Sequence, residues 1–535
     1  MTEVVDTEVI VAGGGPVGML IAAELGLLGV RTVVLEARAA VSERPKANTL
    51  HARAVQSLAR RGYLNGVADV AGTAPQPFHF AGIPGLQLTA PDDEPTPILK
   101  LAQADLERAL ERRATAQGVT VLRSHEVIHV SQDADRVRVL ARTTRPARTS
   151  RSAQTSRSAQ TSRSAQTTRS AQSARSAQSA ESVPSVRTPG GATSFEALYL
   201  VGADGAAGVV REQTGFAAET RAATVSALMG QVRFADPATA PQGWQRTSRG
   251  WVASRTASDG TGVIRTLNFD APTDRRTPPT LDELRTELSY ILGRDVPLTE
   301  APFLSRFSDF IRVACDFRRG RVFLAGDAAH IHFPIGGQGL STGIGDGFNL
   351  AWKLASAVRT GAGDALLDTY DTERRLVVDQ VVDSTRAQLA LMRPAPELDP
   401  LRDLFARLLP LADVRALLGA GVSAQETVCS AGRPSTCERT GTFLSQRQFK
   451  TDRGAEDVID LLQAGRPLLL HHADAGRDHA SVARGWAHVV RLVRVHEDRP
   501  LARDALLVRP DGYIAWTSAD GALTDLLRTW FGPPR

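Results

Sequence analysis

Cysteine is scarce in this sequence, and its scarcity excludes a disulfide framework. Only three cysteines, Cys315, Cys429 and Cys437, occur among the 535 residues. Their number is odd, and none belongs to a Cys-x-x-Cys pair of the kind that binds zinc. We therefore expect reduced thiols, no metal centre and a cytoplasmic location.

Uninterrupted apolar segments of membrane-spanning length are also missing. The first apolar run, residues 9–30, contains several glycines and follows three acids, Glu3, Asp6 and Glu8. A secretory signal would carry a basic flank, and a membrane helix would need about 20 apolar residues without such breaks. The sequence predicts neither a targeting segment nor a membrane partner.

Acidic residues are absent from residues 142–180, which contain eight arginines. The whole chain has a formal net charge of +5 and a sequence pI of about 9.4, values that favour nucleic-acid binding. Without those eight charges, however, the remainder of the chain carries −3. No aromatic residue stands between the arginines to stack on bases, so we expect no nucleic-acid partner.

Large apolar residues are absent from a hexad repeat at residues 149–184. The unit Thr-Ser-Arg-Ser-Ala-Gln begins at 149, 155 and 161 and then degenerates. A β-helix would need an apolar position in each turn, and a packed domain would need far more apolar surface. We predict a disordered insertion over residues 142–190, placed between strands at 137–140 and 195–201 that pair as a hairpin.

A nucleotide-binding pattern opens the chain. Residues 9–12 predict a buried strand, residues 19–28 have a helical apolar pattern, and residues 32–35 predict a second strand. The run 13–18 joins the first strand to the helix as Gly-x-Gly-x-x-Gly. Together with a terminal acid at Glu36, these parts have the spacing of a dinucleotide-binding βαβ unit.

The chemistry of that unit follows from its residue types. Gly13 permits the tight turn, Gly15 lets a pyrophosphate approach the backbone, and Gly18 lets the helix pack on the strand. The helix N-terminus offers N–H groups and a positive dipole end to the phosphates. Glu36 can accept hydrogen bonds from ribose hydroxyls and disfavours a 2′-phosphate. The pattern alone does not separate FAD from NAD.

Two further motifs follow along the chain. Residues 198–205 predict a strand that runs into an Asp-Gly turn, and residues 321–327 predict a strand that ends in Gly-Asp. A glycine-rich run at 334–343 then precedes a predicted helix at 346–359. This second glycine-to-helix junction is also typical of an anion-binding helix start.

With these three motifs in order, the chain resembles the class A FAD-dependent aromatic monooxygenases of the para-hydroxybenzoate hydroxylase type. The likeness is greatest to aromatic polyketide hydroxylases and rifampicin monooxygenases, and it covers nearly the whole chain. It implies an α/β fold. The parts of that fold are a Rossmann-like FAD-binding domain, a mixed-sheet substrate domain and a thioredoxin-like C-terminal domain.

The resemblance also implies domain boundaries. We expect the FAD-binding domain at 1–75, 99–215 and 311–360, the substrate domain at 76–98 and 216–310, a helical segment at 361–420 and the thioredoxin-like domain at 421–535. The last domain lacks a Cys-x-x-Cys motif, which excludes disulfide exchange. In the substrate domain we predict strands at 224–234, 250–255 and 262–269 and a helix at 281–292. Its aromatic residues are either plain core or face a planar ligand; they are Phe234, Trp244, Trp251 and Phe269.

Site residues follow from the resemblance by position. The FAD pyrophosphate and adenosine ribose are assigned to Gly13, Gly15, Pro16, Val17, Gly18, Glu36, Ala37 and Arg38. Arg44, Lys46 and Arg53 resemble the family's basic residues near the pyrophosphate and flavin, and Asp204 would lie near the pyrophosphate and support nicotinamide engagement. Gln103 is assigned to the ribityl chain, the backbone of Val127 to adenine, and Gly326 with Asp327 to the ribityl hydroxyls. The isoalloxazine ring is assigned to Pro334, Gly337, Gln338, Gly339, Leu340 and Ser341. No side chain is predicted as a catalytic nucleophile, although Pro334 and Ser341 lie near the flavin ring. His330 and His332 suggest no metal site, and His330 is predicted to be structural.

Three positions depart from the family pattern. Ser341 stands where asparagine is usual near the flavin ring, Gly208 replaces the serine of the Asp-Gly motif, and Gln56 stands where an acid is common. None of the three removes a residue that the FAD site needs.

The resemblance implies a reaction as well. NADPH or NADH reduces FAD, dioxygen forms a flavin C4a-hydroperoxide, and one oxygen atom enters a small aromatic substrate, expected to be of polyketide type. Two alternatives stay open: Baeyer–Villiger oxygenation of a ketone or quinone, and a non-catalytic FAD- or ligand-binding protein. We expect a monomer or a homodimer.

Overall fold

The computed structural model describes residues 4–144, 192–270, 277–430, 437–472, 478–496 and 504–535. The hexad repeat and nearly all of the segment predicted to be disordered lie outside these residues. Residues 142–144 are described and differ from the prediction. Strand β10 (Val137–Thr143) continues through Thr143 because Arg142 pairs with Ala192 and forms an ion pair with Glu126.

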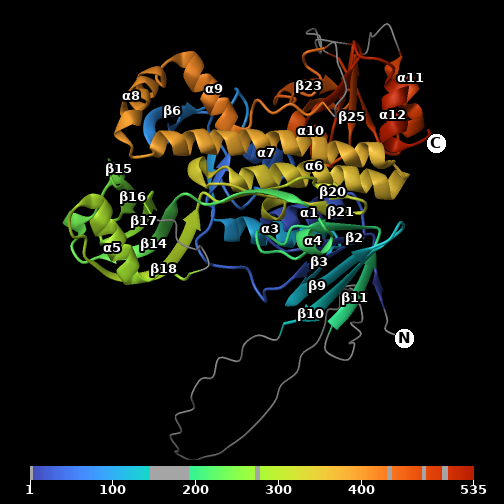
Figure 1. Cartoon of the computed structure of the whole chain (residues 1–535). Coiled ribbons are helices and arrows are strands. Elements are labelled where there is room, and N and C mark those ends of the chain that lie inside the picture. Colours follow the sequence, from blue (N-terminus) through green and yellow to red (C-terminus); the bar gives the residue numbers. More distant parts are fainter. Residues whose placement is uncertain (1–3, 145–191, 271–276, 431–436, 473–477, 497–503) are drawn as a thin grey trace, which may run out of the picture.

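A six-stranded sheet lies at the centre of the molecule (Figure 1). Its strands come from four distant parts of the chain and run parallel except at one edge. Strands of such a sheet are covered on both faces, which explains why the sequence of β2 is continuously apolar. In spatial order the strands are β20 (Arg318–Arg319), β21 (Val322–Leu324), β12 (Tyr199–Gly202), β2 (Val9–Ala12), β3 (Thr32–Glu36) and β8 (Thr120–Arg123).

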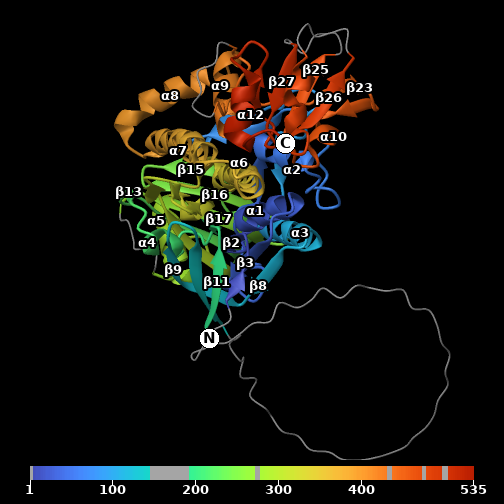
Figure 2. The same cartoon turned by 90° about the vertical axis from the view of Figure 1, so that its right-hand side faces the viewer.

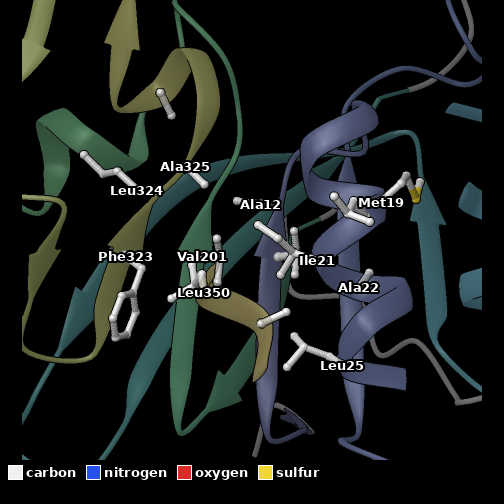
Figure 3. Close-up of a cluster of buried hydrophobic side chains, with 14 of the residues drawn as sticks. Ala12, Met19, Ile21, Ala22, Leu25, Val201, Phe323, Leu324, Ala325 and Leu350 are labelled. Carbon is white, nitrogen blue, oxygen red and sulfur yellow. The ribbon is translucent and has the colours of Figure 1, made fainter. Parts of the chain in front are cut away.

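Helix α1 (Pro16–Leu27) packs on this central sheet and contacts α3 (Gln103–Ala116) and α6 (Gly339–Thr360). Figure 3 shows the largest core cluster, in which side chains from α1 and α6 meet those of the strands. Because every strand residue in this cluster is apolar and enclosed, burial of apolar surface holds the three motifs in one rigid body.

Helix α6 begins at Gly339, earlier than the predicted start at 346. The sequence pattern predicts Gly339 and Gly343 outside the helix, because glycine is a poor helix former. Close packing explains the difference. A Cβ on Gly343 would lie 2.7 Å from Cγ2 of Val17, and one on Gly347 would lie 2.9 Å from a methyl of Leu20. The predicted anion-binding helix start therefore moves to Gly339.

The smaller sheets and helices α2 and α4 of the N-terminal half surround this core. The β9–β10–β11 sheet also contains β1, and β10 pairs antiparallel with β11, as the predicted hairpin requires. The elements are β1 (Val5–Asp6), β4 (Thr49–His51), α2 (Ala52–Arg60), β5 (Gln76–Phe80), β6 (Ile83–Leu88), β7 (Ile98–Lys100), β9 (His125–Gln132), β11 (Ala192–Ala197), α4 (Val210–Gln213), β13 (Ala218–Arg221), β19 (Ile311–Ala314) and β22 (His330–Ile331).

A second large sheet forms the substrate-domain body, and we call it the five-stranded sheet. Its spatial order is β15 (Gly243–Thr247), β16 (Gly250–Thr256), β17 (Thr261–Asn268), β14 (Ser226–Phe234) and β18 (Leu298–Ser308). A mixed sheet was expected, but every pair is antiparallel, because short connections such as 257–260 join neighbouring strands directly. Helix α5 (Leu281–Leu292), at its predicted position, covers one face.

Helices α6 and α7 (Asp364–Met392) run side by side across the molecule (Figures 1 and 2). The C-terminal domain lies on the side of this pair that faces away from the central sheet. Two shorter helices, α8 (Asp399–Leu408) and α9 (Ala412–Ser423), follow α7 and pack over the β5–β6 hairpin.

The C-terminal domain has one sheet with a parallel central pair, β25 (Leu468–His472) and β26 (Arg491–Val495), extended by antiparallel strands. This arrangement confirms the thioredoxin-like fold. Cys315, Cys429 and Cys437 are not joined by disulfides within the part of the chain that the structure describes. The other elements are β23 (Gln448–Thr451), β24 (Gly454–Asp457), α10 (Val458–Leu462), α11 (His479–Ala483), β27 (Ala505–Val508), β28 (Ile514–Thr517) and α12 (Leu523–Phe531).

Within the described residues, no helix is both long enough and apolar enough to cross a membrane. The same part of the chain contains no cluster of histidine, cysteine and acidic side chains with the geometry of a metal site.

Candidate active site

The first glycine motif has the backbone geometry that a phosphate site needs. Gly13 has a positive φ of 105°, and a Cβ there would lie 2.3 Å from the carbonyl oxygen of Ala203. A Cβ on Gly18 would lie 2.0 Å from the carbonyl oxygen of Gly13. Gly15 differs, because a Cβ there would meet nothing within 4 Å. The space in front of α1 therefore opens at Gly15.

No side chain caps the N-terminus of α1, and its first turn contains no acid. Pro16 occupies the first turn, where the missing N–H costs nothing. The remaining N–H groups and the positive dipole end are suited to a pyrophosphate. The uncapped helix start and the open space at Gly15 thus fit the diphosphate of FAD.

Glu36 lies at the carboxyl end of β3, buried and oriented by backbone groups. Its Oε2 accepts a hydrogen bond from the Gly14 N–H at 2.7 Å, and its Oε1 accepts one from the Arg38 N–H at 2.8 Å. Each oxygen retains a lone pair for a ribose hydroxyl. Ala37 and Arg38 follow with exposed side chains.

Lys46 lies between the acidic residues of the first and third motifs. It is within electrostatic reach of Glu36 and Asp327, while desolvation and Arg38 lower the pKa of its ammonium. Arg44 is exposed nearby in sequence. Gln103 starts α3, and its backbone N–H donates to the carbonyl of Ala47 at 3.1 Å. The β3–β4 segment is therefore tied to α3.

Asp204 follows β12 and caps α4. Its Oδ2 accepts a hydrogen bond from the Val210 N–H at 3.0 Å, while its buried Oδ1 has no partner among the described residues. A Cβ on Gly208 would lie 2.0 Å from the Asp204 carboxyl carbon. Glycine at 208, one of the departures from the family pattern, therefore gives Asp204 room to adopt this capping position.

The Gly-Asp motif is supported by a buried network. Asp346 on α6 accepts hydrogen bonds from the Gly326 N–H at 2.9 Å and from Nε2 of His330 at 2.7 Å. Arg374 of α7 donates to the other oxygen of Asp346 at 2.7 Å. His330 thus has the structural contact that we predicted. Asp327 itself is exposed, and burial of its surroundings raises the pKa of its carboxyl.

Residues 334–338 form a loop just before α6, which we call the 334–338 loop. Gly336 and Gly337 both have positive φ, 76° and 68°. Nε2 of His51 contacts the Gly336 carbonyl at 2.7 Å, and the His51 backbone N–H donates to Oγ of Ser341 at 3.0 Å. Ser341 therefore joins α6 to the start of α2. Pro334 is exposed, Leu340 packs against the main core, and Gln338 is buried.

The three motifs converge on the start of α1. Val17 is the contact point, because Cβ atoms on Gly326 and Gly343 would lie 3.2 and 2.7 Å from its side chain. Gly13 lies against the Asp-Gly motif, because a Cβ on Gly13 would lie 2.3 Å from the carbonyl oxygen of Ala203. The convergence leaves an exposed acid, a basic residue and two uncapped helix starts around one open space, and these groups fit FAD.

Two further predicted site residues, Arg53 and Val127, make contacts outside the three motifs. The Arg53 guanidinium stacks on Phe443 at 3.7 Å and donates to Gln56 and to the carbonyls of Ala424 and Gln425. Arg53 also lines a cavity with Gln338 and Ser341, but it is not brought together with Arg44 and Lys46. Val127 is buried in β9 and contributes its side chain to the core.

The aromatic candidates of the substrate domain separate into two groups. Phe234 packs in the cluster beneath α5 and is plain core. Trp251 and Phe269 belong to a different apolar cluster that includes Phe333 and Ile335 of the third motif. Trp244 is 40% exposed and contacts Trp251 edge to face. The face of the five-stranded sheet opposite α5 therefore looks toward the 334–338 loop.

Several residues of this site were missed by sequence reasoning. The partner of His51, Gly336, is 285 positions away, and the contacts of Asp346 with Gly326 depend on how α6 packs. One signal existed for Asp346, an acid among apolar residues on a helix face. No such signal marked His51.

The fold and the site define a flavoprotein monooxygenase, and family models agree. The FAD binding domain model matches residues 6–155 and 147–385, and the model for the aromatic-ring hydroxylase C-terminal domain matches residues 437–534. The chain belongs to the FAD-dependent aromatic-ring hydroxylases.

Individual relatives align over nearly the whole length. The 12-dehydrotetracycline 5-monooxygenase/anhydrotetracycline 6-monooxygenase of Streptomyces rimosus is 33% identical over 98% of this chain and 99% of its own. Dialkyldecalin synthase of Streptomyces rugosporus is 34% identical, again over 98% and 99%. The solved structure of the anhydrotetracycline hydroxylase OxyS from Streptomyces rimosus matches with a TM-score of 0.80 at 32% identity, covering 99% of this chain and 100% of that one.

Proposed function

We propose that this enzyme uses NADPH or NADH and dioxygen to insert one oxygen atom into an aromatic ring of a polyketide. The observation that carries the proposal is the convergence of three motifs on the uncapped start of α1. FAD, when bound there, would supply electron transfer and oxygen activation. The chain itself would hold the cofactor, position the substrate and exclude water.

The residues around the open space have separate tasks. Glu36, fixed by two backbone N–H groups, would hold the adenosine ribose. Asp327 would accept hydrogen bonds from the ribityl hydroxyls. The start of α6 has neither a capping side chain nor an acid in its first turn, so its positive dipole end would stabilise negative charge on the flavin ring.

Apolar side chains would exclude water from the reacting atoms. Phe333 and Ile335 belong to one buried cluster with Trp251 and Leu267 of the five-stranded sheet. Phe333 also stacks with Phe307, with ring centroids 6.4 Å apart. Such a lining suits a planar aromatic substrate, and a dry site protects a reactive oxygen species from hydrolysis.

We further propose a cytoplasmic enzyme that is a monomer or a homodimer. The support for the location is chemical, because the three cysteines form no disulfide within the described residues and the expected reductant is a cytoplasmic dinucleotide.

Anaerobic reduction followed by product analysis tests the function. Adding NADPH and an anthracycline- or tetracycline-type aromatic to the holoenzyme should bleach the oxidised flavin. Readmitted, isotopically labelled dioxygen should give a product heavier by one labelled oxygen atom with the ring count unchanged. Because one relative is named a synthase, redox turnover is the decisive readout. A flavin that stays oxidised with both reductants and all aromatics tried would contradict the proposal, and a lactone product would favour Baeyer–Villiger chemistry.

A further inference from the structure

Three cationic side chains meet on the face of the five-stranded sheet that looks toward the 334–338 loop. We call Lys100, Arg255 and Arg265 the cationic cluster. In the register of β16 and β17, Ala253 pairs with Arg265 and Trp251 pairs with Leu267. Because side chains alternate between faces, Arg255 and Arg265 share the face of Trp251 and Leu267. The opposite face, with Val252 and Ile264, is covered by α5.

Lys100 connects this face to the 334–338 loop. It lies at the end of β7, paired with Thr49 of β4, and its Nζ donates a hydrogen bond to Oγ1 of Thr49 at 2.8 Å. Thr49 in turn adjoins Gly337. A Cβ built on Gly337 would lie 3.7 Å from the Cβ of Thr49. The ammonium is therefore anchored one side chain away from the loop that precedes α6.

Within the described residues, no acidic side chain balances the charges of the cationic cluster. Neither Arg255 nor Arg265 makes a hydrogen bond or an ion pair with any described residue, although other arginines of the same sheet do, such as Arg233 with Glu300. Burial, Arg255 and Arg265 lower the pKa of Lys100, and no carboxylate of the described ranges contributes an opposing effect. Burial and Arg255 likewise lower the pKa of Arg265. Like charges held together without an acid indicate a place for an anion.

The neighbouring histidines add neutral hydrogen-bonding groups. Burial lowers the pKa of His51 and of His79 to about 4, with Lys100 contributing to both, so each imidazole is neutral at pH 7. Nδ1 of His51 is buried and has no hydrogen-bond partner among the described residues. His51, which is 1% exposed, thus adds an unsatisfied polar atom on the same side of the 334–338 loop.

We propose that Lys100, Arg255 and Arg265 form an anion site that binds a phosphate or carboxylate group of a ligand entering between the five-stranded sheet and the 334–338 loop. Guanidinium groups bind both kinds of oxyanion in a bidentate manner, and an ammonium adds a point charge. The bound anionic group belongs either to the reductant, as one of its phosphates, or to an acidic aromatic substrate. The choice between these two sources rests on the proposed function, whereas the existence of the anion site does not.

Calorimetric titration of the FAD-loaded protein at low salt tests the site without any turnover. Inorganic pyrophosphate and benzoate serve as probes, and FAD already occupies its own phosphate site. We expect Lys100→Gln, Arg255→Gln and Arg265→Gln each to weaken binding of at least one probe about tenfold or more. Arg233→Gln is the matched control, since it lies on the same sheet with its charge already paired, and it should bind as the wild type does. Folding of each variant is checked by its flavin content.

Steady-state kinetics of the same variants then identify the source of the anion. A higher KM for both NADPH and NADH assigns the site to the dinucleotide pyrophosphate, and a higher KM for NADPH alone assigns it to the 2′-phosphate. Unchanged reductant KM with weaker benzoate binding assigns it to an acidic substrate. The proposal is overturned if the wild type binds neither probe, or if the triple variant binds both with wild-type affinity. An enzyme that binds the probes but never oxidises NADPH would leave the site standing and refute the proposed function.

Discussion

At the scale of single residues, Gly15 and Gly18 differ in what a methyl group at each position would meet. At Gly15 there is open space, whereas at Gly18 the carbonyl oxygen of Gly13 is 2.0 Å away. Gly15 also has φ −70° and ψ 178°, which alanine adopts without strain. One glycine therefore reserves room for a ligand, and the other allows the chain to fold.

We predict that Gly15→Ala keeps the stability of the apoprotein within about 0.5 kcal/mol, the usual range for a substitution away from packed contacts. FAD affinity should fall by tenfold or more, because the methyl group enters the space of the pyrophosphate. Gly18→Ala should give little folded protein. Urea unfolding of the apoprotein and fluorescence titration with FAD measure the two effects. Normal FAD affinity of Gly15→Ala would place the pyrophosphate elsewhere.

At the scale of elements, α1 and α6 pack closely through the glycines of α6. Alanine at Gly343 would gain about 1 kcal/mol of helix propensity, yet its Cβ would lie 2.7 Å from Val17. Overpacking of this kind typically costs about 1–3 kcal/mol. We expect Gly343→Ala to lower the unfolding temperature, and Val17→Ala combined with it to restore part of the loss. A rise in unfolding temperature for the single variant would contradict the close packing.

Elements defined by local pattern could be predicted from the sequence. The glycine turn, the apolar strands and α5 depend on neighbouring residues, and α5 has its predicted bounds, with Thr280 capping the first turn. The start of α6 could not be predicted in the same way, because its glycines are required by Val17 and Leu20, residues more than 300 positions away. The cationic cluster was missed for a related reason, since the register of β16 and β17 places Arg255 and Arg265 on one face and Lys100 comes from β7, in a distant part of the chain.

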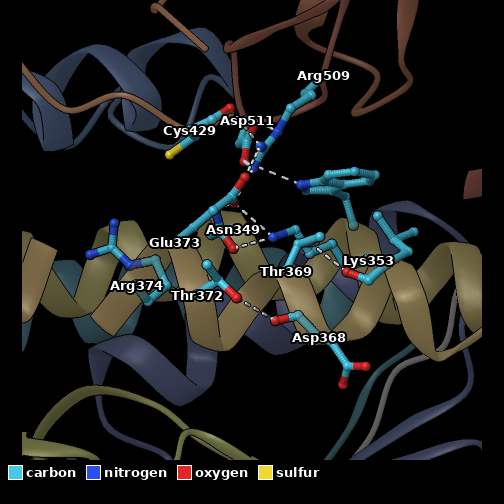
Figure 4. A network of polar contacts seen from close by, with 12 residues as sticks. Asn349, Lys353, Asp368, Thr369, Thr372, Glu373, Arg374, Cys429, Arg509 and Asp511 are labelled. Carbon is cyan, nitrogen blue, oxygen red and sulfur yellow. Dashed lines mark hydrogen bonds and ion pairs between the residues drawn. The ribbon is translucent and has the colours of Figure 1, made fainter. Parts of the chain in front are cut away.

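At the scale of the whole molecule, a buried ion network joins the C-terminal domain to α6 and α7 (Figure 4). Glu373 of α7 accepts hydrogen bonds from Arg509 at 2.5 and 2.9 Å and from Lys353 of α6 at 2.8 Å. Asp511 binds the same guanidinium, and all four side chains are buried. No sequence pattern indicates this network, because Glu373 and Arg509 are 136 positions apart.

Glu373 should make stability depend on pH. Burial alone would raise the pKa of its carboxyl, but Arg509 and Lys353 hold it well below the ordinary value. A lowered folded-state pKa stabilises the protein above the unfolded-state pKa, near 4.5. As the pH falls below that value, the unfolded chain binds a proton that the folded chain does not. This stability is therefore lost at up to about 1.4 kcal/mol per pH unit.

We predict that Glu373→Gln lowers the free energy of unfolding at neutral pH by about 3–5 kcal/mol, the usual effect of breaking a buried pair. The substitution should also flatten the dependence of the free energy of unfolding on pH between about 5 and 3. Urea unfolding followed by tryptophan fluorescence is the measurement, because Trp352, Trp486, Trp516 and Trp530 share one core cluster at this junction. Glu219→Gln, at an exposed ion pair with Arg375, is the control and should change little. Equal acid slopes for wild type and Glu373→Gln would contradict the assignment.

Deleting the hexad repeat tests whether the insertion contributes to FAD binding. Deleting residues 149–182 removes five arginines and one glutamate and lowers the formal net charge from +5 to +1. The two strands that flank the insertion are already adjacent, because Arg142 of β10 pairs with Ala192 of β11. We expect flavin content and FAD affinity to stay at the wild-type level while the pI falls. Loss of flavin from the deletion variant would show that the segment contributes to the cofactor site.

The central sheet also has a consequence for protein synthesis. Its strand β2 ends at Ala12, but β21, which completes the parallel part of the sheet, begins at Val322, about 310 residues later. At roughly 5–20 residues per second, a ribosome needs about 15–60 s to make that stretch. During this time β2 has β3 beside it but lacks β12 until residue 199 is made, and β12 then lacks β21. The nascent chain is therefore expected to need chaperone protection until its third motif emerges, and slow translation of the repeat would lengthen that exposure.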